Sequence, residues 1–180
     1  MERYRITGDA GVYFVTFKIM EAMPVLIDEA ACKIITDYVN FSVHNKGLGV
    51  NAYVIMPNHL HAVVFDLDFN DKRLRETLDD IRKFTGRKLL DHGDRSQSDA
   101  FMSAFKHGAG ADRRRKFWQP AQPLDRLIAD KSWRQKVNTI HSNPVRKGLV
   151  RSPEDWRFSS AGAWLKGIPG NDVDLSEIVW

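Results

Sequence analysis

The sequence predicts a single α+β domain whose mainly antiparallel sheet is flanked by helices. Residues 12–19, 50–56 and 59–65 are rich in β-branched and aromatic side chains, which is typical of strands. Residues 24–43 and 74–90 carry apolar side chains at helical spacing. The resulting order of strand, helix, strand, strand, helix fits an α+β domain and does not resemble the alternating units of a doubly wound fold.

The ends of these elements carry recognisable signals. Asp28 is placed to cap the first helix, and Pro57-Asn58 suits a tight turn between two strands. Residues 91–112 are polar and rich in Gly, Ser and His, which predicts a mobile loop with at most one short helical turn. A further helix is predicted over 132–142, and Asn143-Pro144 should end it.

The end of the sequence is expected to pack differently from the rest. Residues 152–156 indicate a turn or the start of a short helix. We expect one domain over 1–165 and a weakly packed tail over 166–180, which Ile178, Val179 and Trp180 could anchor.

Composition narrows the function only slightly. The chain has 180 residues and a net charge of +4, a mild excess that favours a polyanionic partner. Its one cysteine, Cys32, lies in an apolar helical pattern, so we expect a buried core residue, no intrachain disulfide and a reducing cytoplasm. No stretch approaches the roughly 18 apolar residues of a membrane span, so no membrane partner is expected.

The sharpest local feature is His59-Leu60-His61 in the third predicted strand. Residues two apart in a strand point to the same face, so both imidazoles can converge on one divalent ion while Leu60 points into the core. A pair of histidines is an incomplete site, because a metal that polarises a phosphate needs at least one more ligand. A chance surface pair is the alternative.

A second feature is the segment TIHSNPVRKGLV at 139–150, followed by PEDWRFSS at 153–160. Taken alone, it indicates only a helix that stops at a turn. Together with AYVIMPNHLH at 52–61, however, it resembles the REP-associated tyrosine transposases. These belong to the wider HUH single-tyrosine transposases, in which HUH denotes His-hydrophobic-His. YFVTF at 13–17, KFT at 83–85 and FWQ at 117–119 extend the likeness over residues 3–164.

This resemblance implies a ferredoxin-like HUH domain with Mg²⁺ or Mn²⁺ held by His59 and His61. It also implies a partner, single-stranded DNA beside a hairpin, which such proteins cleave and transfer through a tyrosine on a late helix. The covalent phosphotyrosine link conserves the phosphodiester energy for rejoining, and the metal orients the phosphate and offsets its charge.

The sequence departs from the family at the nucleophile. Thr139 stands where the family's tyrosine precedes Ile-His-x-Asn-Pro, and all four tyrosines lie elsewhere, at 4, 13, 38 and 53. Asn143 lies four residues later on the same helix face. By the resemblance it is the candidate third metal ligand, with a helix cap as its alternative role, whereas His141 is expected to be structural or to face DNA.

Basic residues form three groups that could contact phosphates, the middle one followed at once by aromatic residues that could stack bases. The predicted DNA-binding residues are Lys83, Arg87, Arg113, Arg114, Arg115, Lys116, Trp118, Arg146 and Lys147.

The sequence therefore predicts a transposase-like protein that binds hairpin-containing single-stranded DNA, as a monomer or a homodimer. Whether it cuts is left open by Thr139. The alternatives are a nuclease with another nucleophile such as water, a catalytically inactive DNA-binding module derived from such a transposase, and a structural metal protein without a DNA partner.

Overall fold

Four antiparallel strands form the central sheet in the order β3-β4-β2-β5. The computed structural model describes residues 3–7, 10–96, 102–103, 105, 115–167 and 172–180. The strands are β2 (Val12–Lys18), β3 (Leu48–Met56), β4 (His59–Asp66) and β5 (Asp125–Leu127), and the helices between them are α1 (Glu29–Lys46) and α2 (Asp71–Ser96). The sequence β2-α1-β3-β4-α2-β5 with this strand order is the ferredoxin-like arrangement, so the predicted fold class is confirmed.

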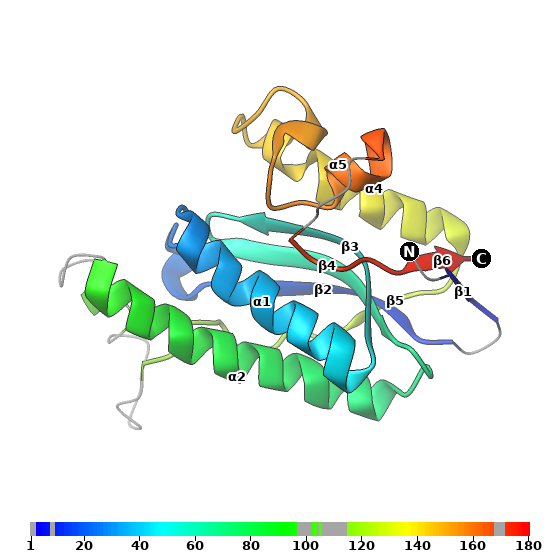
Figure 1. Cartoon of the computed structure of the whole chain (residues 1–180), viewed down its shortest axis with the longest axis horizontal. Helices are drawn as coiled ribbons and strands as arrows, with labels where there is room; N and C mark the ends of the chain where they lie inside the picture. Colours follow the sequence, from blue (N-terminus) through cyan, green and yellow to red (C-terminus); the bar gives the residue numbers. More distant parts are fainter. Residues whose placement is uncertain (1–2, 8–9, 97–101, 104, 106–114, 168–171) are drawn as a thin grey trace.

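The two faces of the sheet are covered by different helices (Figure 1). α1 and α2 lie together on one face, and α4 (Asp130–Arg146) crosses the other face near α5 (Ala161–Lys166). Alternation along β4 divides its side chains between two apolar clusters: Leu60 joins the core beneath α1 and α2, whereas Val63 joins the core beneath α4. Leu60 is therefore buried on the face opposite to the histidines, as the sequence predicted.

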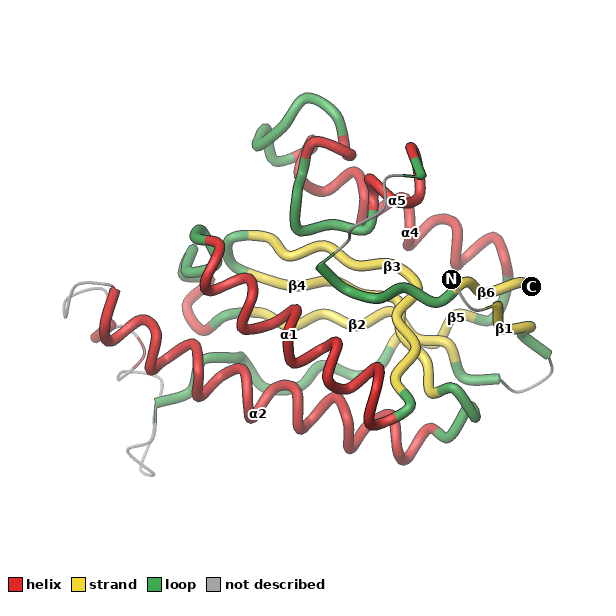
Figure 2. Tube along the Cα trace, viewed as in Figure 1, coloured by secondary structure: helices red, strands yellow, loops and turns green. Residues whose placement is uncertain are grey.

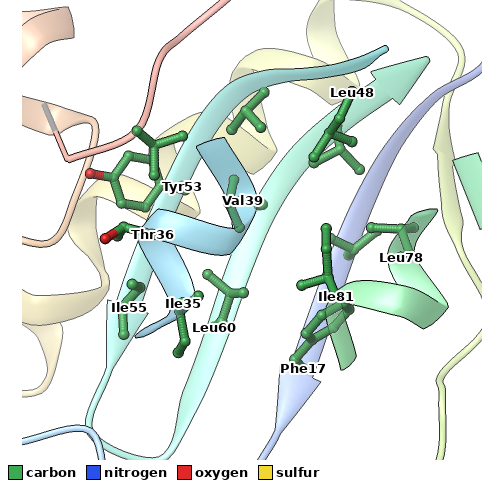
Figure 3. Close-up of a pocket in the computed structure, with 15 residues that line it drawn as sticks. Phe17, Ile35, Thr36, Val39, Leu48, Tyr53, Ile55, Leu60, Leu78 and Ile81 are labelled. Carbon is green, nitrogen blue, oxygen red and sulfur yellow. The ribbon is translucent and has the colours of Figure 1, made fainter. Parts of the chain in front are cut away.

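The core beneath α1 and α2 is tightly packed and apolar. A cavity of about 30 Å³ remains between the sheet and the two helices, lined by residues such as Ile35, Leu60 and Ile81 (Figure 3). Its volume is about the share of one water molecule in the liquid, and its lining offers a water almost no hydrogen-bond partner. It is a packing defect.

Local signals place the helix ends. The Asp28 carboxylate accepts a hydrogen bond of 2.8 Å from the Ala31 backbone N–H, which confirms the predicted N-cap. α1 ends at Gly47, whose φ of 67° suits glycine. The loop predicted from residue 91 onwards is wrong for its first part, because α2 continues to Ser96 and buries Leu90 and Gly93. Most of residues 97–112 lie outside the described residues.

The predicted end of the late helix at Asn143-Pro144 is also wrong. α4 continues through Pro144 to Arg146. Proline removes one backbone donor, but here it lies close to the helix end, and the Asn143 and Pro144 carbonyls still accept bonds from the Lys147 and Leu149 N–H groups. Asn143 and Pro144 are both buried, so the packing of this last turn outweighs the local preference to stop.

The C-terminal segment returns to the start of the chain. β6 (Glu177–Val179) pairs in parallel with β1 (Arg3–Arg5), and the two strands lie side by side in Figure 2. Ile178 is buried in the core beneath α4, so it anchors the tail as anticipated, and the expected weak packing does not describe this part. Two short 3-10 helices complete the described elements. η1 (Met20–Ala22) follows β2, and η3 (Pro153–Asp155), which lies between α4 and α5, is the short helix predicted near 152–156.

No helix within the described ranges has the length and apolar character needed to cross a membrane. The division into a domain over 1–165 and a tail over 166–180 stays a prediction.

Candidate metal and nucleic-acid site

The two motif histidines lie at the start of β4, on the face that α4 crosses. His59 and His61 are both partly buried, and their ring centroids are 4.6 Å apart. They therefore lie on one face and converge, as their spacing predicted. The His61 ring also stacks on Phe14 of β2, at 5.1 Å between centroids.

Both rings use Nδ1 for a hydrogen bond to a neighbouring side chain. Nδ1 of His59 lies 2.6 Å from Oδ1 of Asn58, and because an amide oxygen only accepts, Nδ1 carries the proton. Nδ1 of His61 lies 2.9 Å from the Thr16 hydroxyl, which stands directly opposite it in the β2–β4 pairing. With Thr16 accepting, His61 has the same tautomer, and both rings present the Nε2 lone pair to the site.

Asn143 brings α4 to this pair. Its Nδ2 donates a hydrogen bond of 3.0 Å to Nε2 of His59, from a side chain that is almost fully buried. Since the helix continues past Asn143, the alternative role as a C-terminal cap is wrong. A half-turn of the amide would direct Oδ1 toward the same place, which is the geometry a third ligand needs.

Positive charge surrounds the histidines. Burial and then the nearby Lys147 and Lys18 lower the pKa of His59. Burial, His59 and the cations Lys18, Lys136 and Arg146 lower the pKa of His61 to about 3. Both rings are therefore neutral near pH 7, which is the form that ligates a metal.

The donor set fits a divalent ion in part. Two imidazole nitrogens and one amide oxygen suit Mn²⁺ better than Mg²⁺, which prefers oxygen. Within the described residues, no group of three or more His, Cys, Asp or Glu side chains gathers at one place. A cation here would thus lack a carboxylate and sit among like charges.

Comparison with known proteins also relates the chain to transposases. No family model matches the chain. A REP-associated tyrosine transposase of Escherichia coli (strain K12) is 26% identical over 111 residues, which is 62% of this chain. The match covers 53% of that relative, so the chain spans about half of its length. A solved structure of a REP-associated tyrosine transposase bound to a REP hairpin has a TM-score of 0.57 at 21% identity, covering 97% of this chain and 92% of that one.

The chain is similar to the REP-associated tyrosine transposases. The solved structure shares the fold, and the curated relative shares sequence, so the resemblance predicted from the motifs is confirmed.

Thr139 stands at the position where the resemblance predicts a tyrosine. Thr139 is partly exposed one helical turn before Asn143, and its hydroxyl donates to the Gln135 carbonyl at 2.8 Å. Tyr13 and Tyr53 are buried in the core beneath α1 and α2. Of the other two tyrosines, Tyr38 stacks on Phe84, and Tyr4 packs on Phe65.

The predicted DNA-binding residues are not all brought together. Arg146 and Lys147 lie at the end of α4 beside the histidines. Lys147 lowers the pKa of His59, and Arg146 lowers the pKa of His61. Lys83 and Arg87 are exposed on α2, in the layer on the opposite side of the sheet (Figure 1). Arg113 and Arg114 lie outside the described residues.

The structure places the basic and aromatic residues at 115–118 differently from one another, and the DNA-binding role of Arg115 and Lys116 stays a prediction. Arg115 forms a two-pronged ion pair with Asp94, at 2.5 Å for each bond, and only Lys116 is exposed. Trp118 is 5% exposed and donates to the Thr85 hydroxyl at 3.0 Å. The structure thus corrects the prediction for Trp118, because a ring packed in the core has no face free for a base.

Several residues that support the site were missed by the sequence reasoning. Thr16 and Asn58 orient the two rings, and Lys18 and Lys136 add charge. Asn58 was assigned only to the turn, although its place next to His59 was a usable signal. Thr16 could have been found only by fixing the register of β2 against β4.

His141 has a structural role, one of the two predicted for it. It is buried, and its Nε2 lies 2.8 Å from the Ser160 hydroxyl, which also accepts from the Tyr53 backbone N–H. Through Ser160, this contact joins α4 to β3 and so helps to position Asn143 next to the histidines.

Proposed function

We propose that this chain is a transposase-like protein that binds hairpin-containing single-stranded DNA, with the phosphate backbone lying over His59 and His61 beside the last turn of α4. The observation that carries the proposal is the combination of two neutral imidazoles and a buried Asn143 amide with several cations around them. Such a surface attracts a phosphodiester, because the positive charges of Lys18, Arg146 and Lys147 add up there, although the fourth cation, Lys136, is paired with Asp125.

The similar proteins support a DNA partner of this kind. The relative from Escherichia coli is a transposase, and the solved structure with the same fold holds a REP hairpin. A hairpin with unpaired flanks also suits a positively charged site, because unpaired nucleotides can bend toward it while the hairpin stays outside.

Mg²⁺ or Mn²⁺ at His59, His61 and Asn143 would orient the phosphate and offset the charge that develops on it during cleavage and transfer of a DNA strand. The chain's own groups prepare this site: Asn58 and Thr16 hold the Nε2 lone pairs toward it. Lys18 and Arg146 neutralise the incoming phosphate.

A second candidate function is a catalytically inactive DNA-binding module derived from such a transposase. Thr139 favours it, because an aliphatic hydroxyl stays protonated near neutral pH and this one donates to a backbone carbonyl. The retained histidine pair favours the active enzyme.

Fluorescence anisotropy tests the binding proposal. The probe is a labelled DNA hairpin with single-stranded flanks, and the competitor is a blunt duplex of the same composition. We expect the flanked hairpin to bind at least about tenfold more tightly, and Mn²⁺ to strengthen binding in the wild type. The variant His59→Gln/His61→Gln should lose the effect of Mn²⁺, whereas the control His44→Gln, an exposed histidine on α1, should keep it. Equal affinity for hairpin and duplex would contradict the proposal.

A denaturing gel separates the two candidates. A metal-dependent covalent adduct between the wild-type chain and the oligonucleotide would identify an active enzyme with another nucleophile. Specific binding without an adduct or cleaved product would identify the inactive module.

A further inference from the structure

A second cavity lies at the outer edge of β2, and nothing described above uses it. Its volume is about 220 Å³, and it is bounded by β2, by α2 and by the segment that precedes β5. We call it the edge pocket; its lining includes Thr16, Phe17, Arg75, Asp79, Arg82 and Ala121. It shares no lining residue with the hollow at His59 and His61, and the hydrogen bond from Arg82 to the Gln119 carbonyl lies between the two. The edge pocket is therefore a separate site.

The floor of the edge pocket is apolar and small. Val15, Phe17 and Leu78 belong to the core beneath α1 and α2, and each of them also lines the pocket. The guanidinium carbon of Arg82 lies 5.1 Å from the centroid of the Phe17 ring and so covers one side of it. The volume is below the roughly 300–1,000 Å³ of drug-sized ligand pockets, which favours an occupant with about one apolar side chain.

The backbone of Thr16 offers one donor and one acceptor to this pocket. The Ile19 N–H donates to the Asn58 carbonyl, so alternation along the antiparallel pair turns the N–H and C=O of Thr16 away from β4. Among the described residues, no hydrogen bond reaches the Thr16 backbone from the outer side. A bound molecule can therefore exchange two hydrogen bonds with this residue.

The gap at Thr16 admits the end of a peptide and excludes a continuous strand. β5 pairs with β2 as far as Phe14, and on the other side the Gln119 N–H donates to the Lys18 carbonyl at 2.7 Å. Continuing the register beyond Phe14 would bring Pro123 opposite Thr16, and proline has no N–H to donate. An extended strand is thus blocked in both directions. A terminal residue needs one exit only, which the exposed residues before β5 leave toward solvent.

Charge decides which end of a peptide fits. Arg75, Asp79 and Arg82 recur at intervals of four and three residues along α2, so they face the pocket from one side of the helix. Burial lowers the pKa of Arg82 and the Asp79 carboxylate opposes this change, so these two charges act on each other. Arg75 is exposed and forms no ion pair with a carboxylate of the described residues. A C-terminal carboxylate would meet this cation, whereas an N-terminal ammonium group would meet a like charge.

Within the described part of the chain, the edge pocket thus combines an apolar floor, an unpaired backbone donor and acceptor, and an unpaired guanidinium. We propose that it binds the C-terminal residue of a partner protein, with an apolar last side chain on Val15 and Phe17 and the α-carboxylate at Arg75. The last amide N–H of such a partner donates to the Thr16 carbonyl. This inference does not rest on the proposed function, because the edge pocket and the histidine hollow share no residue and can be occupied together.

Fluorescence anisotropy with a labelled peptide tests the proposal. The probe is a short polar peptide that ends in leucine with a free carboxylate, and the comparison peptide carries a C-terminal amide. The wild type should bind the free acid at least about tenfold more tightly, which is the effect of roughly one charge-assisted hydrogen bond. A third peptide that ends in aspartate should bind as weakly as the amide, because it cannot cover the apolar floor. Equal binding of the acid and the amide would overturn the proposal.

Two variants at exposed positions locate the binding. Arg75→Gln removes the cation and should reduce the preference for the free acid to below about threefold. Ala121→Leu narrows the pocket and should weaken binding of both leucine peptides. Lys72→Gln is the matched control, because it removes one charge from α2 at a solvated position outside the pocket, and it should bind like the wild type. An unchanged acid preference in Arg75→Gln, or unchanged affinity in Ala121→Leu, would place the peptide elsewhere and refute the assignment.

Two competitors separate a protein C-terminus from other occupants. Free N-acetylleucine should compete at least about fivefold less well than the unlabelled peptide, because it lacks the preceding residues that cross the exposed rim. Equal competition would identify a free acylated amino acid as the ligand and overturn the protein partner. A saturating amount of the flanked DNA hairpin should leave peptide binding unchanged. Displacement of the peptide by the hairpin would show that the edge pocket belongs to the DNA site and would overturn the separate role.

The same measurements keep this inference apart from the proposed function. Failure of the hairpin to bind leaves the peptide titrations interpretable, since they contain no DNA. Failure of the peptide to prefer a free carboxylate overturns the edge pocket alone.

Discussion

Neutralising Arg146 and Lys147 together should flatten the salt dependence of single-strand binding. Both side chains are exposed at the end of α4, beside the histidine pair, and neither forms an ion pair with a described carboxylate. The variant Arg146→Gln/Lys147→Gln keeps length and polarity but removes two charges. It therefore probes phosphate contact at this site while leaving the core beneath α4 intact.

The magnitude follows from the number of charges. For a single strand, each phosphate contact contributes about 0.7 to the slope of log affinity against log salt. Two lost contacts should reduce the slope by about 1.4. Over a fourfold rise in salt, the wild type should then lose about sevenfold more affinity than the variant.

Anisotropy titrations at several salt concentrations measure both slopes. The matched control is Lys83→Gln/Arg87→Gln, which removes one lysine and one arginine from exposed positions on α2, on the other side of the sheet. Its slope should stay within about 0.5 of the wild type. If the α2 pair changed the slope as much as the α4 pair, the DNA would follow the other layer and our site would be misplaced.

Three further outcomes are expected. Thr139→Tyr, with Mn²⁺ and the flanked hairpin, should recover a covalent adduct on a denaturing gel, since a phenol ionises more readily than an aliphatic hydroxyl; an equal yield from the wild type would remove any need for the substitution. Trp118→Ala should lower the free energy of unfolding in urea by about 3–5 kcal/mol, and a loss under about 1 kcal/mol would be incompatible with its burial in the core. Burial lowers the pKa of His141 from 6.5 to about 4, so the unfolded chain takes up a proton first and stability declines as pH falls from 6.5 to about 4. This contributes at most about 3 kcal/mol, and His141→Gln should be less sensitive to pH over that window; an unchanged pH profile would argue against a neutral, buried His141.

Periodicity was enough to predict the sheet and the face that carries the histidines. Alternation in β4 placed Leu60 in one core and His59 and His61 on the other face, because the two-residue repeat of a strand depends on nothing beyond the strand itself. Asp28 was predictable for a similar reason, since its hydrogen bond is made three residues along the chain.

The failures share a different cause. The Asn143-Pro144 pair predicted the end of the helix, yet α4 continues to Arg146 because its last turn is buried. Trp118 follows a basic run and looked like a base-stacking residue, but it fills the core between β2 and α2. Nothing in the sequence near Thr16 indicated its contact with His61. In each case the outcome depends on a residue distant in sequence, which composition and spacing do not reveal.

The pairing of β1 with β6 separates the geometry of the site from the order of the chain. Arg3 and Glu177 are direct neighbours in the register and are joined by an ion pair of 2.7 Å. A short linker across this pair would close the chain into a ring at little entropic cost, and new ends could be opened in a surface loop. Such a circular permutant would still place β2, β4 and α4 together around the histidines, although these elements would follow one another in a different order along the chain. The site is thus a property of how three elements pack, and a protein engineer could choose where its polypeptide begins.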